Sequence, residues 1–134
     1  MTVTTHINPE TMHVNPAFTQ VVRVASAADL VYVGGQNGVD ATGTVVGPDL
    51  ASQTRQAMKN LRTCLTAAGA GPEHVVKWTI LIREGESLEE GFAAFVETWG
   101  QRPNPPAITA AFVSGLAVPG ALVEIEAVAA VPAA

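Results

Sequence analysis

Apolar residues recur along the chain at two spacings, and each spacing predicts one type of element. They alternate with polar residues over 18–25 and 75–82, and β-branched residues are frequent over 107–113 and 122–131, which predicts four strands. Shorter strands are predicted over 30–33 and, less distinctly, over 44–46. Because only a short turn over 26–29 separates the strands at 18–25 and 30–33, we expect these two to form a hairpin.

Two further segments carry apolar residues three or four positions apart, which predicts helices. The first begins after Pro48 with Asp49 as its N-cap and is stopped by the glycines and the proline of residues 69–72. The second begins at Ser87, which forms a capping-box pattern with Glu90, and it ends at Gly100. Both helices therefore have start and stop signals as well as an apolar face.

The predicted element order is β-β-(β)-α-β-α-β-β. This order predicts an α/β (α+β) fold in which two helices cover one face of a mixed sheet. We expect residues 1–134 to form a single domain, since the chain has no internal repeat and no linker. The second sheet face is left bare, and self-association is the simplest way to cover it. Charged residues are only 14% of the chain, below the usual quarter, which also favours an interface.

Composition and charge argue against several classes of function. The net charge is −5 and the basic residues are scattered, so nucleic-acid binding is disfavoured. No apolar run is long enough to cross a membrane, and the first residues do not form a signal peptide, so we expect a cytoplasmic protein. The single cysteine, Cys64, and the spacing of the three histidines predict no metal site, and we expect no cofactor.

Five local strings, in order and at consistent spacing, carry a resemblance to a known family. They are NPAFTQ at 15–20, VGGQ at 33–36, QTRQAMKNL at 53–61, VVKWT at 75–79 and PGALVEIEA at 119–127. Together they resemble the RidA (YjgF) superfamily over nearly the whole chain. The resemblance implies a homotrimer with a central barrel of three sheets, outer helices, and ligand clefts between subunits. It also implies hydrolysis of reactive enamines and imines such as 2-aminoacrylate, which releases ammonia and a 2-oxo acid.

The chain departs from the family at the residue that is expected to hold the substrate carboxylate. Typical members have an arginine there, and Ile108 stands in its place within Pro106-Ala107-Ile108-Thr109. An arginine fork binds both carboxylate oxygens, whereas an aliphatic side chain binds neither. Three other matched positions are also less polar than in the family, namely Phe18, Gly34 and Phe92. We therefore expect a more apolar cleft and a different ligand.

Glu124 matches the family glutamate that the resemblance implies positions or activates a water. It shares one strand face with Glu126, and two interpretations stay open: a cleft residue, or a solvated or interface carboxylate. Backbone groups near Gly35 and Ala110 are expected to hold polar ligand atoms, with Thr109 beside them.

Two other side chains lie close to the matched strings. Arg102 is the nearest candidate for a replacement cation, and His13 precedes the opening segment. We interpret both as exposed residues rather than as parts of the cleft.

Two hypotheses of function remain, and the sequence does not decide whether the protein is an enzyme. The first is a deaminase-type hydrolase of imines or enamines that lack the usual carboxylate. The alternative is a non-catalytic trimer that binds a small molecule or a protein partner in the same clefts. A third possibility, RNA cleavage, is disfavoured because it needs cations for the phosphate and histidines in the matched strings.

Overall fold

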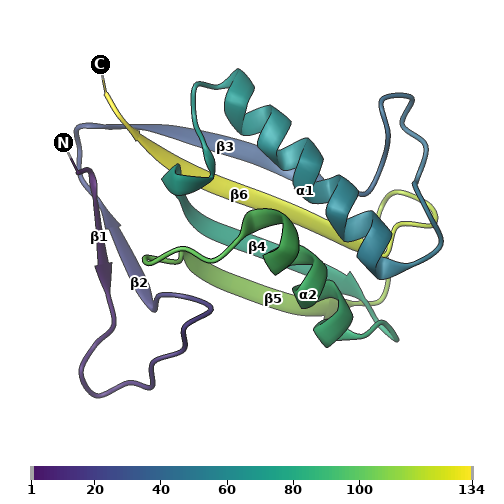
Figure 1. The fold of residues 1–134 in the computed structure, drawn as a ribbon, viewed down its shortest axis with the longest axis horizontal. Coiled ribbons are helices and arrows are strands. Elements are labelled where there is room, and N and C mark those ends of the chain that lie inside the picture. Colours follow the sequence, from purple (N-terminus) through teal and green to yellow (C-terminus); the bar gives the residue numbers. More distant parts are fainter. Residues whose placement is uncertain (1, 134) are drawn as a thin grey trace.

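The computed structural model describes residues 2–133 and contains a four-stranded mixed sheet with both α-helices on one face (Figure 1). The strand order is β3-β6-β4-β5, in which β6 is antiparallel to β3 and β4, and β4 is parallel to β5. The predicted fold of two helices on a mixed sheet is thereby confirmed. The elements of this unit are β3 (Ala28–Gln36), α1 (Leu50–Ala67), the short 3-10 helix η1 (Pro72–His74), β4 (Val75–Arg83), α2 (Leu88–Trp99), β5 (Ala107–Val113) and β6 (Val123–Pro132).

Both helices begin at the N-caps that the sequence indicates. The Asp49 carboxylate accepts a hydrogen bond from the Ser52 backbone N–H at 2.8 Å, and Ser87 Oγ accepts one from the Glu90 N–H at 3.3 Å. The hydrogen bonds from Ser52 lower the pKa of Asp49 below its ordinary value. Neither helix, within residues 2–133, is long and apolar enough to cross a membrane.

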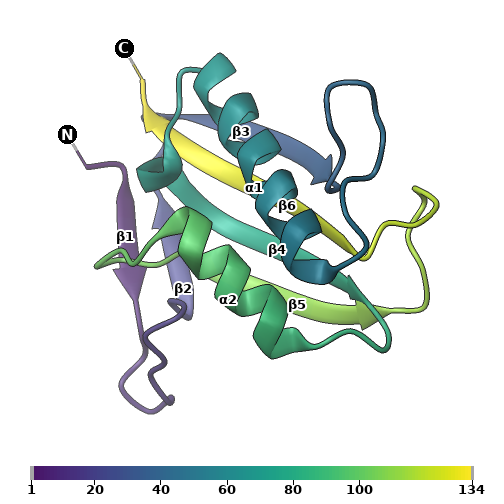
Figure 2. The same ribbon diagram turned by 45° about the vertical axis from the view of Figure 1, so that its right-hand side comes forward.

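The expected hairpin between the first two predicted strands is wrong. The strand at 18–25 is observed as β2 (Val21–Val24), and it pairs with β1 (Thr4–Ile7), an element the sequence pattern did not reveal. β3 pairs with β6 instead. The segment 44–46 contributes only an isolated bridge between Val39 and Val45. Figure 2 shows the β1–β2 ribbon crossing beside one end of the main sheet.

The β1–β2 ribbon is held by a small apolar cluster of its own. Val3 is buried with Val76 and Ala130 of the main sheet, and Val22 and Val24 pack against them. This contact explains the pairing, because it buries the apolar side of β2 over the end of β4 and β6. A β2–β3 hairpin would leave Val3 without that contact.

The main core lies between the sheet and the helices and is built around Trp78 of β4. Its ring makes T-shaped contacts with Phe95 and Trp99 of α2, at centroid distances of 5.3 Å and 5.9 Å. Trp78 is 1% exposed. These edge-to-face contacts stabilise the packing of α2 beyond the area they bury.

A buried glutamine, Gln53, fixes α1 against two loops. Its Nε2 donates to the carbonyl oxygens of Gly47 at 3.3 Å and Gly120 at 3.2 Å, and its Oε1 accepts from the Leu122 N–H at 2.8 Å. A Cβ on Gly38 would overlap the Gln53 backbone, so only glycine allows this approach. The chain before α1 and the chain before β6 are therefore both tied to the same helical turn.

The sheet face opposite the helices is partly apolar and open to solvent in the isolated chain. Leu30 and Tyr32 of β3 are 49% and 73% exposed. Tyr32 lies opposite Val128 of β6. A surface of this kind on a protein with few charges agrees with the expected self-association, which stays a prediction.

Replacing Gln53 by leucine tests its role as a link. The Gln53→Leu variant should lose about 1–3 kcal/mol of unfolding free energy, because the half-buried Leu122 N–H and two carbonyls lose their partners. The matched control is Gln56→Leu on the same helix, which loses one side-chain bond to Asn60 and should change stability by less than about 0.5 kcal/mol. Chemical denaturation measures both. Equal effects of the two variants would contradict the assignment.

Candidate functional site

Ile108 lines a pocket of about 390 Å³ on the helix side of the sheet, named here the Ile108 pocket. It lies between α2, the edge strand β5, and the loop at residues 15–18. Its wall is mainly hydrocarbon and aromatic. The apolar lining residues are Ala17, Phe18, Ile80, Ile82, Leu88, Gly91, Phe92, Phe95, Ile108, Ala110, Val123 and Ile125.

Four of the residues expected in the site meet in this pocket, namely Phe18, Phe92, Ile108 and Ala110. Ile108 and Ala110 point to the same side because successive residues of a strand alternate between faces. Phe92 comes from α2 and is 42% exposed, so its ring can contact a ligand. β5 is an edge strand within residues 2–133, and it has no strand partner on its outer side.

The other four expected residues lie on the opposite face of the sheet or at its end, outside the pocket. Glu124 lies between Val123 and Ile125, which both face the pocket, so strand alternation directs the carboxylate away. Within one chain, Glu124 and Ile108 therefore lie on opposite faces of the sheet, and the expected cleft between subunits stays a prediction.

Thr109 and the two glycines, Gly34 and Gly35, are also separate from the pocket. Thr109 faces away from Ile108 for the same reason of alternation, and its hydroxyl accepts a hydrogen bond from Lys77 Nζ at 2.6 Å. The two glycines lie in a β-bulge of β3, where its register with β6 shifts between Val33 and Gln36.

Glu124 has a defined position against the Gly34–Gly35 bulge. Its Oε1 lies 3.4 Å from Asn37 Nδ2, which also donates to the Val123 carbonyl at 3.0 Å. Its Oε2 lies so close to Gly35 that a Cβ there would collide with it. Glu124 forms no salt bridge with any residue of 2–133. The glycine therefore makes room for the carboxylate, and the expected approach of its backbone to a ligand stays a prediction.

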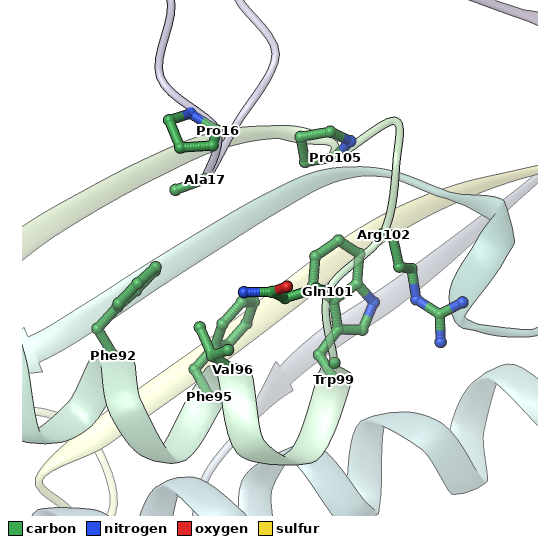
Figure 3. A pocket seen from close by; sticks show the side chains of 10 residues that line it. Pro16, Ala17, Phe92, Phe95, Val96, Trp99, Gln101, Arg102 and Pro105 are labelled. Atoms are coloured by element: carbon green, nitrogen blue, oxygen red, sulfur yellow. The ribbon is translucent and has the colours of Figure 1, made fainter.

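A second hollow of about 350 Å³ continues from the Ile108 pocket along α2 (Figure 3). The two hollows share Ala17, Phe92 and Phe95. The second is also lined by Trp99, Gln101 and Arg102. The Arg102 guanidinium carbon lies 5.5 Å from the Trp99 ring centroid, and Figure 3 shows the side chain at the far end from Phe92. Arg102 is half-buried in this hollow, so its interpretation as an exposed residue is wrong, and it lies outside the lining of the Ile108 pocket.

His13 is exposed, as interpreted, yet it contacts a residue of the pocket wall. Its ring meets Phe18 edge to face at a centroid distance of 6.3 Å. It can steady Phe18 at the pocket rim, and it is not itself part of the lining.

Three polar residues of the pocket were missed by the sequence analysis: Asn15, Thr54 and Glu89. Thr54 lies four residues after Leu50 on the buried face of α1, so helical spacing alone could have indicated it. Glu89 is in the first turn of α2, where an acidic residue also has an ordinary role near the helix N-terminus. Asn15 belongs to the opening segment, and its Oδ1 accepts from the Ala17 N–H at 2.8 Å.

Comparison with known proteins finds one matching family over most of the chain. A family model described as endoribonuclease L-PSP matches residues 11–131. The chain is 35% identical to the human 2-iminobutanoate/2-iminopropanoate deaminase, over 74% of this chain and 71% of that protein. It is 33% identical to a RutC family protein of Pyrococcus horikoshii, over 77% of this chain and 80% of that protein. The crystal structure of the Rid family protein YyfB from Yersinia pestis, a protein of unknown function, superposes with a TM-score of 0.82 at 30% identity. The match covers 96% of this chain and 98% of that chain.

Alanine at Gly35 should displace the Glu124 carboxylate, whereas alanine at Gly34 should leave it in place. A Cβ at Gly35 meets Glu124, while a Cβ at Gly34 meets nothing within 4 Å. Since the obstacle is the mobile end of a side chain, neither variant should unfold the protein. Crystal structures of both variants measure the distance from Glu124 Oε1 to Asn37. An unchanged distance in Gly35→Ala would contradict the packing described here.

Proposed function

Because the chain belongs to the RidA (YjgF) superfamily, the family whose model is described as endoribonuclease L-PSP, we propose that it hydrolyses an imine or enamine that carries no carboxylate at the usual position. Named relatives act on 2-iminobutanoate and 2-iminopropanoate, which are carboxylates. This chain shares their family and differs in the group that would hold such a carboxylate. The proposal keeps the reaction type and changes the substrate.

The observation that carries the proposal is Ile108 in an apolar pocket with no cation in its lining. A buried carboxylate without a hydrogen-bonding partner is strongly disfavoured, and a charge-assisted hydrogen bond contributes about 1.5–3 kcal/mol. A substrate carboxylate at Ile108 would lose its hydration and gain no such bond. A hydrocarbon group at the same place gains from burial.

Glu124 is the residue proposed to handle the attacking water. Hydrolysis requires a group that takes a proton from water as it adds to the C=N carbon and returns a proton to the departing nitrogen. Glu124 faces away from the Ile108 pocket of its own chain, so it would serve the pocket of a neighbouring subunit. This arrangement requires an oligomer with the site between subunits.

A homotrimer with intersubunit clefts is the assembly proposed. The exposed Leu30 and Tyr32 give the bare sheet face an apolar character that burial in such an assembly would relieve. Glu124 lies on the same sheet face, so covering that face brings a neighbouring chain close to the carboxylate.

A non-catalytic trimer that binds a small molecule in the same clefts is the second candidate. It is favoured by the separation of Glu124 from the Ile108 pocket within one chain. Turnover distinguishes the two, because a binding protein gives stoichiometric complexes and no ammonia.

Restoring the arginine should restore the family reaction. Ile108→Arg should raise kcat/KM for ammonia release from 2-aminoacrylate, generated in situ, by roughly 10- to 100-fold, which corresponds to about 1.5–3 kcal/mol. Ile108→Met is the matched control, since it adds a long flexible side chain without charge, and it should give no gain. In the Ile108→Arg background, Glu124→Gln should remove about 100-fold or more of the activity. A natural protein that already matches Ile108→Arg on this substrate would contradict the proposal.

A charge on the bare sheet face should break the assembly. Tyr32→Glu should shift the protein from a three-chain mass to a single-chain mass in analytical ultracentrifugation, because the apolar interface would have to bury a carboxylate. Lys59→Glu on the exposed side of α1 is the control and should leave the mass unchanged. A natural protein that sediments as a single chain would contradict the trimer.

A further inference from the structure

The polar side chains of the Ile108 pocket carry information about the ligand that the missing arginine alone does not. Asn15, Thr54 and Glu89 are the polar members of the lining. The Asn15 Oδ1 already accepts from the Ala17 N–H at 2.8 Å, and its Nδ2 can only donate. Thr54 and Glu89 therefore remain as the lining side chains whose acceptor oxygens are free for a ligand N–H.

Thr54 is a buried hydroxyl without a partner. It is 2% exposed, and its Oγ1 forms no hydrogen bond with any of residues 2–133. Helical threonines often bond to the carbonyl four residues earlier, as Thr63 does here with Lys59 at 3.0 Å, but Thr54 does not. Buried polar groups in proteins are nearly always paired, so an unpaired hydroxyl in a pocket wall indicates a partner on a ligand.

Glu89, an exposed residue of the lining, places a negative charge at the pocket. It is the one titratable side chain in the described lining, and it forms no salt bridge within residues 2–133. The nearest cation of the adjoining hollow, Arg102, is stacked on Trp99 at the far end (Figure 3). Phe18 and Phe92 add aromatic faces, which attract cations. The pocket therefore disfavours an anion and favours a positive group.

We propose that the Ile108 pocket selects a mainly hydrocarbon iminium cation, with Thr54 and Glu89 as the residues that determine this specificity. The hydrocarbon body would occupy the wall around Ile108 and Phe92. The protonated nitrogen would be directed to the Glu89 carboxylate, and the Thr54 hydroxyl would accept an N–H. The inference rests on the proposed function for the reaction type, and it adds the chemical class of the substrate.

The reaction balances without any further reactant. Water adds to the carbon of the protonated C=N bond, the C–N bond then breaks, and a C=O bond forms. An iminium cation and one water give an apolar aldehyde or ketone and an ammonium ion. No oxidant or reductant is needed.

Three small probes of similar shape test the charge preference in the assembled protein: benzylammonium, benzyl alcohol and phenylacetate. Calorimetric or NMR titration gives each Kd. Benzylammonium should bind at least about tenfold more tightly than phenylacetate, because one is attracted by Glu89 and the other repelled. Benzyl alcohol should lie between them.

Two variants and their matched controls assign the preference to residues. Glu89→Gln should weaken the binding of benzylammonium by about three- to tenfold and leave the binding of benzyl alcohol unchanged. Glu90→Gln, in the same helical turn but outside the lining, should change the affinity of neither probe. Thr54→Val should weaken the binding of benzylammonium and of benzyl alcohol by about three- to tenfold. Thr54→Ser, which keeps the hydroxyl, should retain both affinities. Thermal unfolding confirms that Thr54→Val is folded, since valine has the same shape and removes an unpaired hydroxyl.

The outcomes separate this inference from the proposed function. The selectivity is overturned if phenylacetate binds as tightly as benzylammonium, even where imine hydrolysis is observed. It is also overturned if the affinity for benzylammonium is unchanged in both Glu89→Gln and Thr54→Val. A preserved ammonium preference with no ammonia release from any imine supports the selectivity of the pocket and refutes the hydrolase. Failure of the natural protein to bind any of the three probes overturns the inference.

Discussion

The three hydrogen bonds of the Gln53 carboxamide are the constraint on which the rest of the structure depends. They join one turn of α1 to the loop before it and to the chain that enters β6. The residue that follows, Thr54, is thereby fixed in the wall of the Ile108 pocket. The start of β6 is fixed as well, which sets the register that directs Val123 into the pocket and Glu124 away from it. A single buried amide thus joins the wall of the pocket on α1 to the strand that separates Val123 from Glu124.

The alternation of side chains along a strand then divides the candidate site into two halves. Ile108 and Ala110 of β5 face the helices, while Glu124 of β6 faces the other way with Thr109. One sheet cannot present both halves to the same ligand, because its two faces point in opposite directions. A shift of register by one residue would exchange the faces, but it would also expose the core. On the proposed function, the Glu124 carboxylate can serve a pocket only if another chain brings its own pocket to that face. The proposed hydrolysis therefore requires the proposed assembly, and loss of assembly should remove activity even with every side chain intact.

Much of this arrangement could be predicted from the sequence, and the parts that could not have identifiable causes. The helices and β5 follow from local signals, since caps and apolar spacing involve residues a few positions apart. The β1–β2 pairing depends on Val3 reaching Val76, a contact between distant segments that no local pattern encodes. In the site, Phe18, Phe92, Ile108 and Ala110 could be assigned from the family motifs. Helical spacing places Thr54 on the buried face of α1, but its meeting with Glu89 in one pocket could not be predicted, because it depends on how α2 packs on α1, where Gly91 lies against Leu50.

The resemblance implies an arginine at position 108, and on the proposed function the isoleucine found there changes the charge of the pocket rather than removing one contact. Removing a cation from an otherwise neutral pocket would leave a pocket that does not discriminate between ligands by their charge. Its affinity would then depend on the buried hydrocarbon area. Here Glu89 remains at the lining without a salt-bridge partner among residues 2–133, so the balance becomes negative. The buried Thr54 hydroxyl adds a second condition, because a ligand with no polar atom would leave it unpaired. Apolar area then supplies affinity, while one hydroxyl and one carboxylate discriminate between ligands of the same shape.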